Sequence, residues 1–365
     1  MKEMVEFDEG QLKRVAFHLL TFKNPRARSH FFRNKITAGD FFCLERRQLE
    51  SAGLLPAEAQ AVCERGWRIA ETEVERLKKN RAEIIFREDD AYPPLLGQIY
   101  DPPDLLYFTG NREILAKTML AVVGSRRGSA YGQSVLNRIL PECCQAGLVV
   151  VSGMAYGIDS MAHKLALREN AGTIGVNAGG LLHLYPAGNM TLIKKIIDRG
   201  GIVSEFPLDV IPRPFLFPIR NRIIAGLARA VLVVEAALRS GSLITARLAL
   251  EQDRDVMAIP GNIDSLLSQG TNYLLQQGAK LIGSASDLLL EFGLDVPARQ
   301  KIDASLSSKE IKILDLCGEN EVQGIDFLVE TLDWSTAEII SLVMGLVLKN
   351  MLVEEPDGYR RIAYG

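Results

Sequence analysis

The sequence predicts an α/β protein with a doubly wound, mostly parallel sheet in the middle of the chain. Six short apolar segments recur there, most of them followed by glycine or small polar residues: 120–123, 148–151, 173–176, 201–204, 230–234 and 255–258. Stretches long enough for helices separate them. Apolar strands that alternate with helices are typical of a parallel sheet buried on both faces.

Charge is distributed unevenly along the 365 residues and favours three domains, at 1–80, 81–297 and 305–365. Residues 1–80 carry 15 basic and 12 acidic side chains, and residues 305–365 carry 5 and 11. The overall net charge of −3 excludes a uniformly basic nucleic-acid-binding protein. It does not exclude a local basic groove.

The first segment has the pattern of short helices. Residues 11–20 are amphipathic, and Pro56 suits the first turn of a second helix that runs toward Lys79. Between them, residues 23–35 hold five cations, two phenylalanines and no acid. This stretch could contact nucleic acid. It could equally be a solvated helix junction whose phenylalanines form a small core.

The last segment predicts three helices, at 308–317, 324–331 and 335–350, and then a hairpin around Pro356-Asp357-Gly358. This order is a winged-helix pattern. The third helix carries one cation, Lys349. A winged helix that binds duplex DNA needs cations facing phosphates. We therefore expect this domain to contact protein rather than duplex DNA.

Neither a targeting segment nor a metal site is indicated. The N-terminus lacks a signal peptide's apolar stretch, and no apolar run approaches the roughly 18 residues of a membrane span. The five cysteines are scattered without Cys-x-x-Cys spacing. We expect a reduced cytoplasmic protein without membrane contact, metal or cofactor.

The turns that follow the strands are the expected ligand sites, because ligands of parallel sheets bind beyond the carboxyl ends of the strands. The first turn, Gly124-Ser125-Arg126, leads into a helix, and helix N-termini attract phosphate. Arg126 would suit a phosphodiester, or it could pair with a surface acid. The glycine spacing is not Gly-x-Gly-x-x-Gly and no P-loop occurs, which argues against a nicotinamide dinucleotide and a P-loop nucleotidase.

The second turn begins at Ser152 and Gly153. Glycines 153 and 157 would let a ligand approach the backbone, and Ser152 could donate to a phosphate. Asp159 is expected to cap the next helix, on which His163 is either a packing residue or a ligand contact. A later turn holds Asn189, which could bind phosphate or a base edge, or cap the following helix.

Residues 210–229 contain four arginines and no acid: Arg213, Arg220, Arg222 and Arg229. Three prolines predict that the first half is extended. Phe215 and Phe217 lie among the arginines, and an extended basic loop with aromatics can bind phosphates and stack bases. The alternative is a structural crossover whose arginines pair with acids elsewhere. Further on, Ser240 or Ser242 is expected to cap a helix.

Taken in order, these motifs closely resemble the DNA processing protein A (DprA/Smf) family over roughly residues 90–290. The resemblance rests on Gly124-Ser125-Arg126, Ser152-Gly153-Met154-Ala155-Tyr156-Gly157-Ile158-Asp159, Tyr185-Pro186 with Asn189, Phe217-Pro218-Ile219-Arg220-Asn221-Arg222, Ser240-Gly241-Ser242 and Pro260-Gly261. In the family a lysine commonly precedes the Phe-Pro run, where Arg213 is the nearest cation here.

The resemblance implies an extended Rossmann-like domain that binds single-stranded DNA, protects it during natural transformation and loads the RecA recombinase, as a homodimer and without catalysis. It implies a helix-hairpin-helix or sterile-alpha-motif domain before the Rossmann-like domain and a winged helix after it. The expected DNA-binding residues are Gly124, Ser125, Arg126, Ser152, Gly153, Gly157, Asn189, Arg213, Phe217, Arg220, Asn221 and Arg222.

A Rossmann-like nucleotide phosphoribohydrolase of the lysine-decarboxylase-like group is the alternative. Glu235 or Glu251 would then assist cleavage of the N-glycosidic bond. The Pro-Gly-Gly-x-Gly-Thr stretch of that group is not matched by Arg239-Ser240-Gly241-Ser242. No nucleophile–base pair stands out either.

Overall fold

The computed structural model describes residues 7–22, 24–295, 306–318, 322–348, 351–355 and 357–361. Its contacts divide the chain into two compact units, Met1–Asp295 and Val296–Gly365. The sheet and the helices that precede it belong to the first unit. The three domain bounds expected from charge stay a prediction.

The described residues form one nine-stranded sheet in the first unit. In spatial order its strands are β1 (Glu83–Phe86), β2 (Leu105–Gly110), β6 (Gly201–Ser204), β5 (Thr173–Val176), β4 (Val149–Ser152), β3 (Met119–Val123), β7 (Ala230–Val233), β8 (Asp255–Ala258) and β9 (Lys280–Leu281). The run from β6 to β9 is parallel, whereas β2 pairs antiparallel with both β6 and β1. The predicted mostly parallel sheet is confirmed, and β1, β2 and β9 are additions to the six expected strands.

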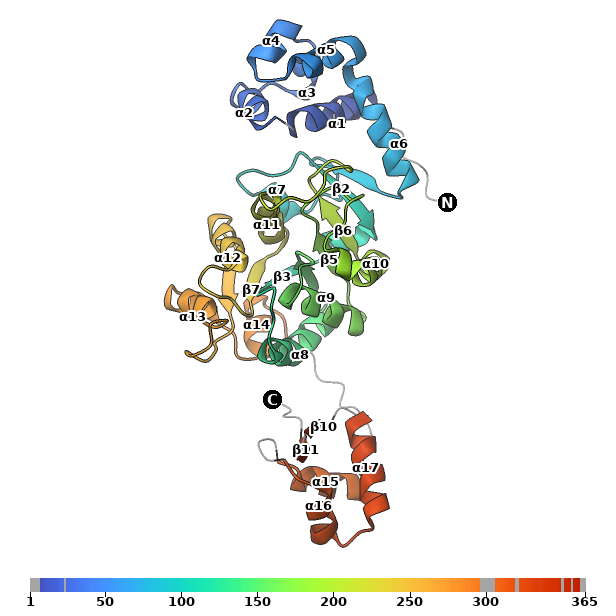
Figure 1. Cartoon of the computed structure of the whole chain (residues 1–365), viewed down its shortest axis with the longest axis vertical. Helices are drawn as coiled ribbons and strands as arrows, with labels where there is room; N and C mark the ends of the chain where they lie inside the picture. The colour runs from blue at the N-terminus through green and yellow to red at the C-terminus, as the bar shows by residue number, and fades with distance from the viewer. Residues whose placement is uncertain are drawn as a thin grey trace. The chain divides into compact units, whose positions relative to one another are not determined.

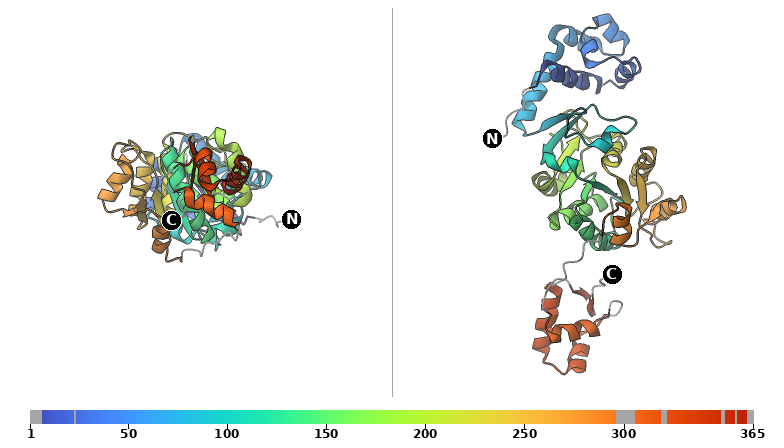
Figure 2. Two further views of the ribbon diagram at one scale, coloured as in Figure 1. Left: turned by 90° about the horizontal axis from the view of Figure 1, so that it is seen from below. Right: turned by 180° about the vertical axis from the view of Figure 1, so that it is seen from behind.

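Helices cover both faces of the sheet, as alternate side chains of β3 show. Leu120 and Val122 pack on one face and Ala121 and Val123 on the other. The first face is covered by α8 (Ala130–Gln145), α9 (Ile158–Arg168) and α14 (Ala285–Glu291). The second is covered by α7 (Pro94–Gly97), α11 (Leu216–Leu227), α12 (Gly241–Glu251) and α13 (Gln269–Gln276). Figures 1 and 2 agree that α12 and α13 lie toward the opposite edge of the sheet from β1 and β2.

One further helix, α10 (Met190–Arg199), follows the short 3-10 helix η3 (Ala187–Asn189) and packs beside α9 (Figure 1). Ile193 and Ile196 on its inner side are fully buried against β2 and β6. The lysines and arginines of α9 and α10 are consequently left on the outer surface, because the apolar faces of both helices point to the sheet.

The residues before the sheet are helical, as predicted. The helices are α1 (Glu9–Phe22), α2 (Pro25–Arg33), α3 (Ala38–Phe41), α4 (Arg46–Ser51), α5 (Pro56–Arg65), η1 (Gly66–Ala70) and α6 (Glu71–Lys79). The single helix expected from Pro56 to Lys79 is wrong. Gly66 adopts φ 55°, which ends α5, and a 3-10 turn separates α5 from α6.

The basic stretch 23–35 forms α2 for most of its length. Phe31 is fully buried and packs edge-on against Phe17 and Phe41. Arg28 donates to the buried Glu205 at 3.1 Å. These contacts agree with the interpretation as a helix junction with a small core. The side chain of Phe32 and the whole of Lys23 lie outside the described residues.

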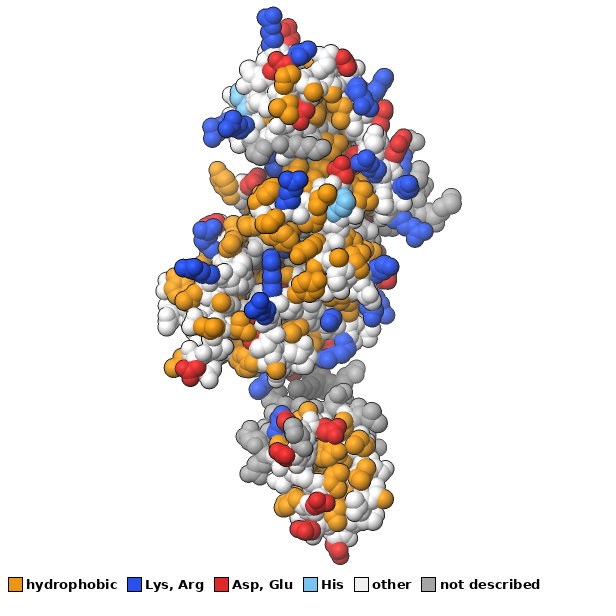
Figure 3. Space-filling model, in the orientation of Figure 1, with side chains coloured by type: hydrophobic (Ala, Val, Ile, Leu, Met, Phe, Trp, Pro, Cys, Tyr) orange, Lys and Arg blue, Asp and Glu red, His pale blue; other side chains and the backbone are white. Residues whose placement is uncertain are grey.

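The second unit contains α15 (Ser308–Leu316), α16 (Ile325–Leu332), α17 (Thr336–Leu348) and the antiparallel strands β10 (Leu352–Glu355) and β11 (Gly358–Arg361). It has its own core, in which Ile313, Leu328 and Val343 are fully buried. The charged side chains seen on this unit in Figure 3 are mainly acidic. Lys349 lies outside the described residues, and the winged-helix assignment stays a prediction.

Candidate nucleic-acid interface

The order of the strands reverses beside β3. From β3 the chain proceeds through β4 and β5 to β6 on one side, and it then returns to form β7 on the other. Beyond the carboxyl ends of β3 and β7, the backbone N–H of Ser125 donates to the carbonyl of Glu235 at 2.7 Å. Such a switch point is where open α/β sheets form a ligand crevice.

A cavity of about 410 Å³ lies at this switch point. The loop after β3, the loop between β4 and α9, the first turns of α11 and the start of α12 all line it. Six of the predicted DNA-binding residues meet there, namely Gly124, Ser125, Arg126, Phe217, Arg220 and Asn221. The structure thus brings together residues that lie nearly one hundred positions apart in the sequence.

Arg126 is the exposed cation of this cavity. Its guanidinium carbon lies 5.5 Å from the centre of the Phe217 ring. Within the described part of the chain it forms no ion pair, so the alternative of a surface ion pair is not supported. Phe217 also meets the Tyr185 ring edge-on, with 5.5 Å between the ring centres. Arg126 is therefore a cation free to meet an anion, beside aromatic rings.

Arg220 lines the same cavity but is only 4 % exposed. Its Nη1 donates to the carbonyl oxygens of Gly153, at 3.0 Å, and of Val176. Burial lowers the pKa of Arg220 to about 10, although the nearby Asp159 opposes this shift and Arg126 adds to it. Most of this guanidinium is committed to the protein, so its main role here is to hold two loops together.

The first half of residues 210–229 was expected to be extended, and this is wrong from Leu216 onward. The segment from Leu216 to Leu227 is helix α11, and Pro218 falls in its first turn, where the missing N–H leaves no hydrogen bond unmade. On this helix Arg222 is turned away from the cavity. It forms ion pairs with Glu205 and, at 3.8 Å, with Asp101. The structural alternative, arginines paired with distant acids, therefore holds for Arg222.

The other two predicted DNA-binding residues of the 210–229 segment lie in different hollows. Asn221 lines the cavity, where its amide lies 3.5 Å from the carbonyl of Gly241. Arg213 is exposed on the extended stretch before α11 and lines a different hollow, together with Phe215 and Ile219. Arg213 is thus outside the switch-point cavity.

The glycines of the two turns are required by the protein itself. A Cβ on Gly124 would lie 2.7 Å from the Ile158 side chain, and one on Gly153 would lie 2.7 Å from Arg220. Gly157 adopts φ +75°, and a Cβ there would overlap the carbonyl oxygen of Ser125. The loops after β3 and β4 therefore pack directly against each other. These glycines were expected to let a ligand approach the backbone, but the packing of the loops explains them without a ligand.

Two polar side chains of the second turn serve the scaffold. Ser152 is fully buried, and its hydroxyl donates to the Val122 carbonyl at 2.6 Å, so the idea that it donates to phosphate is corrected. Asp159 does not cap its own helix. It accepts from the backbone N–H groups of Gly153, at 3.1 Å, and Ala155, at 3.4 Å. Burial raises the pKa of Asp159, and Arg220 opposes that rise.

Asn189 and His163 also have internal partners. The Asn189 amide donates to the Met154 carbonyl at 3.0 Å and to the Ser160 hydroxyl at 2.7 Å, and its side chain makes no capping hydrogen bond. His163 is fully buried, with Nδ1 2.7 Å from the Thr173 hydroxyl. This burial favours the packing interpretation, and it lowers the pKa of His163 to about 3.

The start of α12 belongs to the cavity and was not among the predicted site residues. Ser240 caps this helix, because its hydroxyl accepts from the Ser242 N–H at 3.3 Å, as one of the two expected alternatives. Gly241, Ser242 and Thr245 complete this wall. Free N–H groups at a helix start favour an anion. The small polar residues after β7 were the available signal in the sequence.

The carboxylates expected of a phosphoribohydrolase have structural partners. Glu235 is 2 % exposed and accepts from the backbone N–H of Ser129 at 2.9 Å and from its hydroxyl. It therefore anchors the start of α8. Glu251 is exposed on α12, 3.5 Å from Arg247. This arrangement does not favour the hydrolase alternative.

The described residues contain no group of three or more His, Cys, Asp or Glu side chains placed to hold a metal ion. None of their helices is long and apolar enough to cross a membrane.

The fold and the cavity define a class of protein, the Rossmann-like α/β proteins whose ligand crevice lies at the switch point of a doubly wound sheet. Residues 83–293 match the family described as DNA recombination-mediator protein A, and the chain belongs to this family. The resemblance drawn from the sequence motifs is thereby confirmed.

Several relatives are similar over much of the chain. Protein Smf of Escherichia coli (strain K12) is 36% identical over 323 residues, which are 86% of each chain. An X-ray structure of DNA processing protein A from Streptococcus pneumoniae has a TM-score of 0.63 and 35% identity, over 79% of this chain and 99% of that one. A structure that describes the single-stranded DNA binding mode of DNA processing protein A from Helicobacter pylori has a TM-score of 0.53 and 30% identity, over 58% and 95%.

Proposed function

We propose that this protein binds single-stranded DNA in the switch-point cavity and processes DNA as a recombination mediator. The observation that carries the proposal is Arg126, an exposed cation without an ion-pair partner among the described residues, beside the Phe217 ring and the start of α12. The single-stranded DNA binding mode described for the Helicobacter pylori relative supports it.

The cavity offers two kinds of contact to a single strand. Arg126 and the N–H groups at the start of α12 would meet phosphate oxygens. The rings of Phe217 and Tyr185 would stack bases, and each stacked base contributes about 1–3 kcal/mol. Every base has a π-face, so binding of this kind tolerates any sequence. Its affinity falls as salt rises, because phosphate contacts release counterions.

Arg127 provides a matched control for the test of this proposal. It follows Arg126, is also exposed and does not line the cavity. We expect Arg126→Ala to weaken binding of a labelled oligothymidine at least tenfold, measured by fluorescence anisotropy, and Arg127→Ala to change it far less. Equal affinity of the two variants would refute the site. Phe217→Ala should weaken binding without changing the slope of affinity against salt.

The proposed function also involves a partner protein and an oligomeric state. We propose that it protects incoming single strands during natural transformation and loads RecA onto them, as a homodimer formed through the Rossmann-like domain, and that no catalytic step is involved. RecA-mediated strand exchange on coated DNA, with and without the protein, tests the loading. Sedimentation of the full chain tests the dimer, since a monomer at all concentrations would contradict it.

A further inference from the structure

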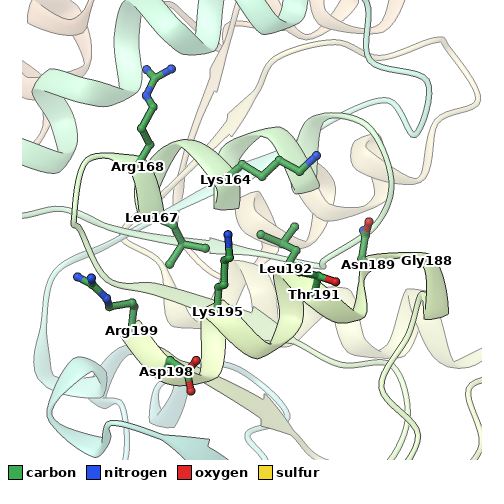
Figure 4. Close-up of a pocket in the computed structure, with 10 residues that line it drawn as sticks. All are labelled: Lys164, Leu167, Arg168, Gly188, Asn189, Thr191, Leu192, Lys195, Asp198 and Arg199. Atoms are coloured by element: carbon green, nitrogen blue, oxygen red, sulfur yellow. The ribbon is translucent and has the colours of Figure 1, made fainter.

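A second hollow of about 710 Å³ lies between α9 and α10, outside the switch-point cavity. Its charged lining consists of four cations and one acid, namely Lys164, Arg168, Lys195, Arg199 and Asp198 (Figure 4). We call this hollow the α9–α10 groove. Its positive charge comes from two helices that are adjacent in space.

Two of these cations have no charge to neutralise them. Lys164 and Lys195 are exposed, and neither forms an ion pair or a hydrogen bond within the described ranges. Figure 4 shows Lys195 directed into the space between the two helices, whereas Asp198 points away from it. Like charges that share a hollow repel each other, and a bound anion would remove that repulsion.

At the other end of the groove, Arg168 forms an ion pair with Glu169 at 3.2 Å. Arg199 donates to the neutral amide of Asn170 at 3.3 Å, which engages its guanidinium without neutralising the charge. Among the described residues, the groove cations without any such partner are therefore the two lysines, with Thr191 beside them. The helix pattern explains why lysines lie on the outer surface of α10, but it does not explain why two lysines without ion pairs line one hollow.

The loop between β4 and α9 connects this groove with the switch-point cavity. Ala155 lines the cavity, and the next residue, Tyr156, is 47 % exposed. A Cβ on Gly188, which lines the groove, would lie 2.5 Å from the Tyr156 hydroxyl. Asn189 is hydrogen-bonded to the carbonyl of Met154 in the same loop. A chain that leaves the cavity past Ala155 therefore reaches the groove over Tyr156.

We infer that the α9–α10 groove is a second contact site for the same single strand, one that holds its phosphodiester backbone through Lys164 and Lys195. This inference rests on the proposed function, since the strand must first occupy the switch-point cavity. None of the described residues that line the groove has an aromatic ring, so phosphates are bound there without stacking of bases. Only a strand long enough to extend beyond the cavity gains from it.

The test compares oligothymidines of increasing length on the full chain. We expect affinity of the unmodified protein to rise when the strand becomes long enough to reach the groove. Lys164→Gln with Lys195→Gln should remove this rise and leave the affinity of the shortest binding strand unchanged. Since each phosphate contact contributes about −0.7 to the slope of log affinity against log salt, the slope on long strands should also become less negative by about 1.4 in the double variant.

The control removes two charges elsewhere in the same unit. Lys194 lies on α10 without lining the groove, and Lys117 lies two residues before β3; both are exposed and outside the described ion pairs. If Lys117→Gln with Lys194→Gln has the same effect as the groove variant, the inference is overturned. It is also overturned if the groove variant binds long strands normally but no longer supports RecA, which would indicate an acidic protein partner. Failure of the unmodified protein to bind any strand would instead reject the proposed function.

Discussion

Arg220 and Asp159, two buried residues of opposite charge, hold the same peptide segment from two sides. Arg220 donates to the carbonyl of Gly153, and Asp159 accepts from the N–H of that residue. Asp159 lies on α9 and Arg220 on α11, so the pair ties helices from both faces of the sheet to the loop after β4. The wall of the switch-point cavity depends on this link.

Replacing Arg220 by alanine is therefore expected to destabilise the fold as well as to weaken DNA binding. The sequence alone predicts a binding defect without unfolding. Removal of the guanidinium leaves the carbonyls of Gly153 and Val176 without this buried donor, and each unsatisfied buried group costs about 1–3 kcal/mol. The midpoint of urea unfolding should fall for Arg220→Ala and stay near that of the unmodified protein for Arg126→Ala. Equal midpoints for the two variants would contradict the structural role.

Gly157 tests whether the packing of the two loops creates the cavity. Gly157→Ala places a Cβ against the Ser125 carbonyl oxygen at φ +75°. Gly147→Ala is the matched control, because Gly147 has φ +88° and open space around it. The control should lose about 1–2 kcal/mol from backbone strain alone. We expect Gly157→Ala to lose clearly more stability and to reduce oligothymidine binding, and similar values for both variants would argue against loop packing.

Because two histidines are buried, we expect the stability of the fold to decrease in mild acid. Burial lowers the pKa of His18 to about 4, with Arg28 adding to the shift, and the pKa of His163 to about 3. The unfolded chain takes up these protons near pH 6.5 and the folded chain does not. Below pH 6.5 each histidine should therefore remove up to about 1.4 kcal/mol per pH unit, until its folded pKa is reached.

The urea midpoint measured from pH 7 to pH 4.5 checks this prediction. His163→Gln should decrease the slope of stability against pH, because one of the two groups is then missing. Glu205 affects stability over a different, more acidic pH range. Arg222 and Arg28 lower its pKa against the effect of burial, so its contribution is present above about pH 4.5 and is lost as the pH falls further. A midpoint that is constant over the range would contradict the assignment to the histidines.

The C-terminal unit should add nothing to duplex DNA binding. Residues 305–365 carry 11 acids and 5 basic side chains, and negative charge near phosphates opposes binding. A chain that ends at Asp295 keeps the first compact unit. It should bind a labelled duplex at least as well as the full chain, in a gel shift across a range of salt. A tighter, more salt-dependent duplex complex of the full chain would show that the unit does bind duplex DNA.

Local patterns in the sequence predicted much of the fold. Six strands were predicted within a residue of their observed ends, because buried parallel strands form apolar runs bounded by small residues. The strands β1 and β2 were missed, although most of their residues are buried, since they lack that alternation with helices. β9 has two residues, both exposed, and no local pattern could indicate it.

The α/β class, the family motifs and the turns that line the switch-point cavity follow from the sequence alone, which also predicted Arg126 and Phe217 as residues of these turns. Which cations remain available follows from the tertiary structure. Arg222 pairs with Glu205, a residue that also binds Arg28 from the N-terminal helices, 177 positions away. Arg220 is buried, and Lys164 and Lys195 face an open groove. The physical reason is that the availability of a charge depends on long-range neighbours and on burial, which local sequence patterns do not contain.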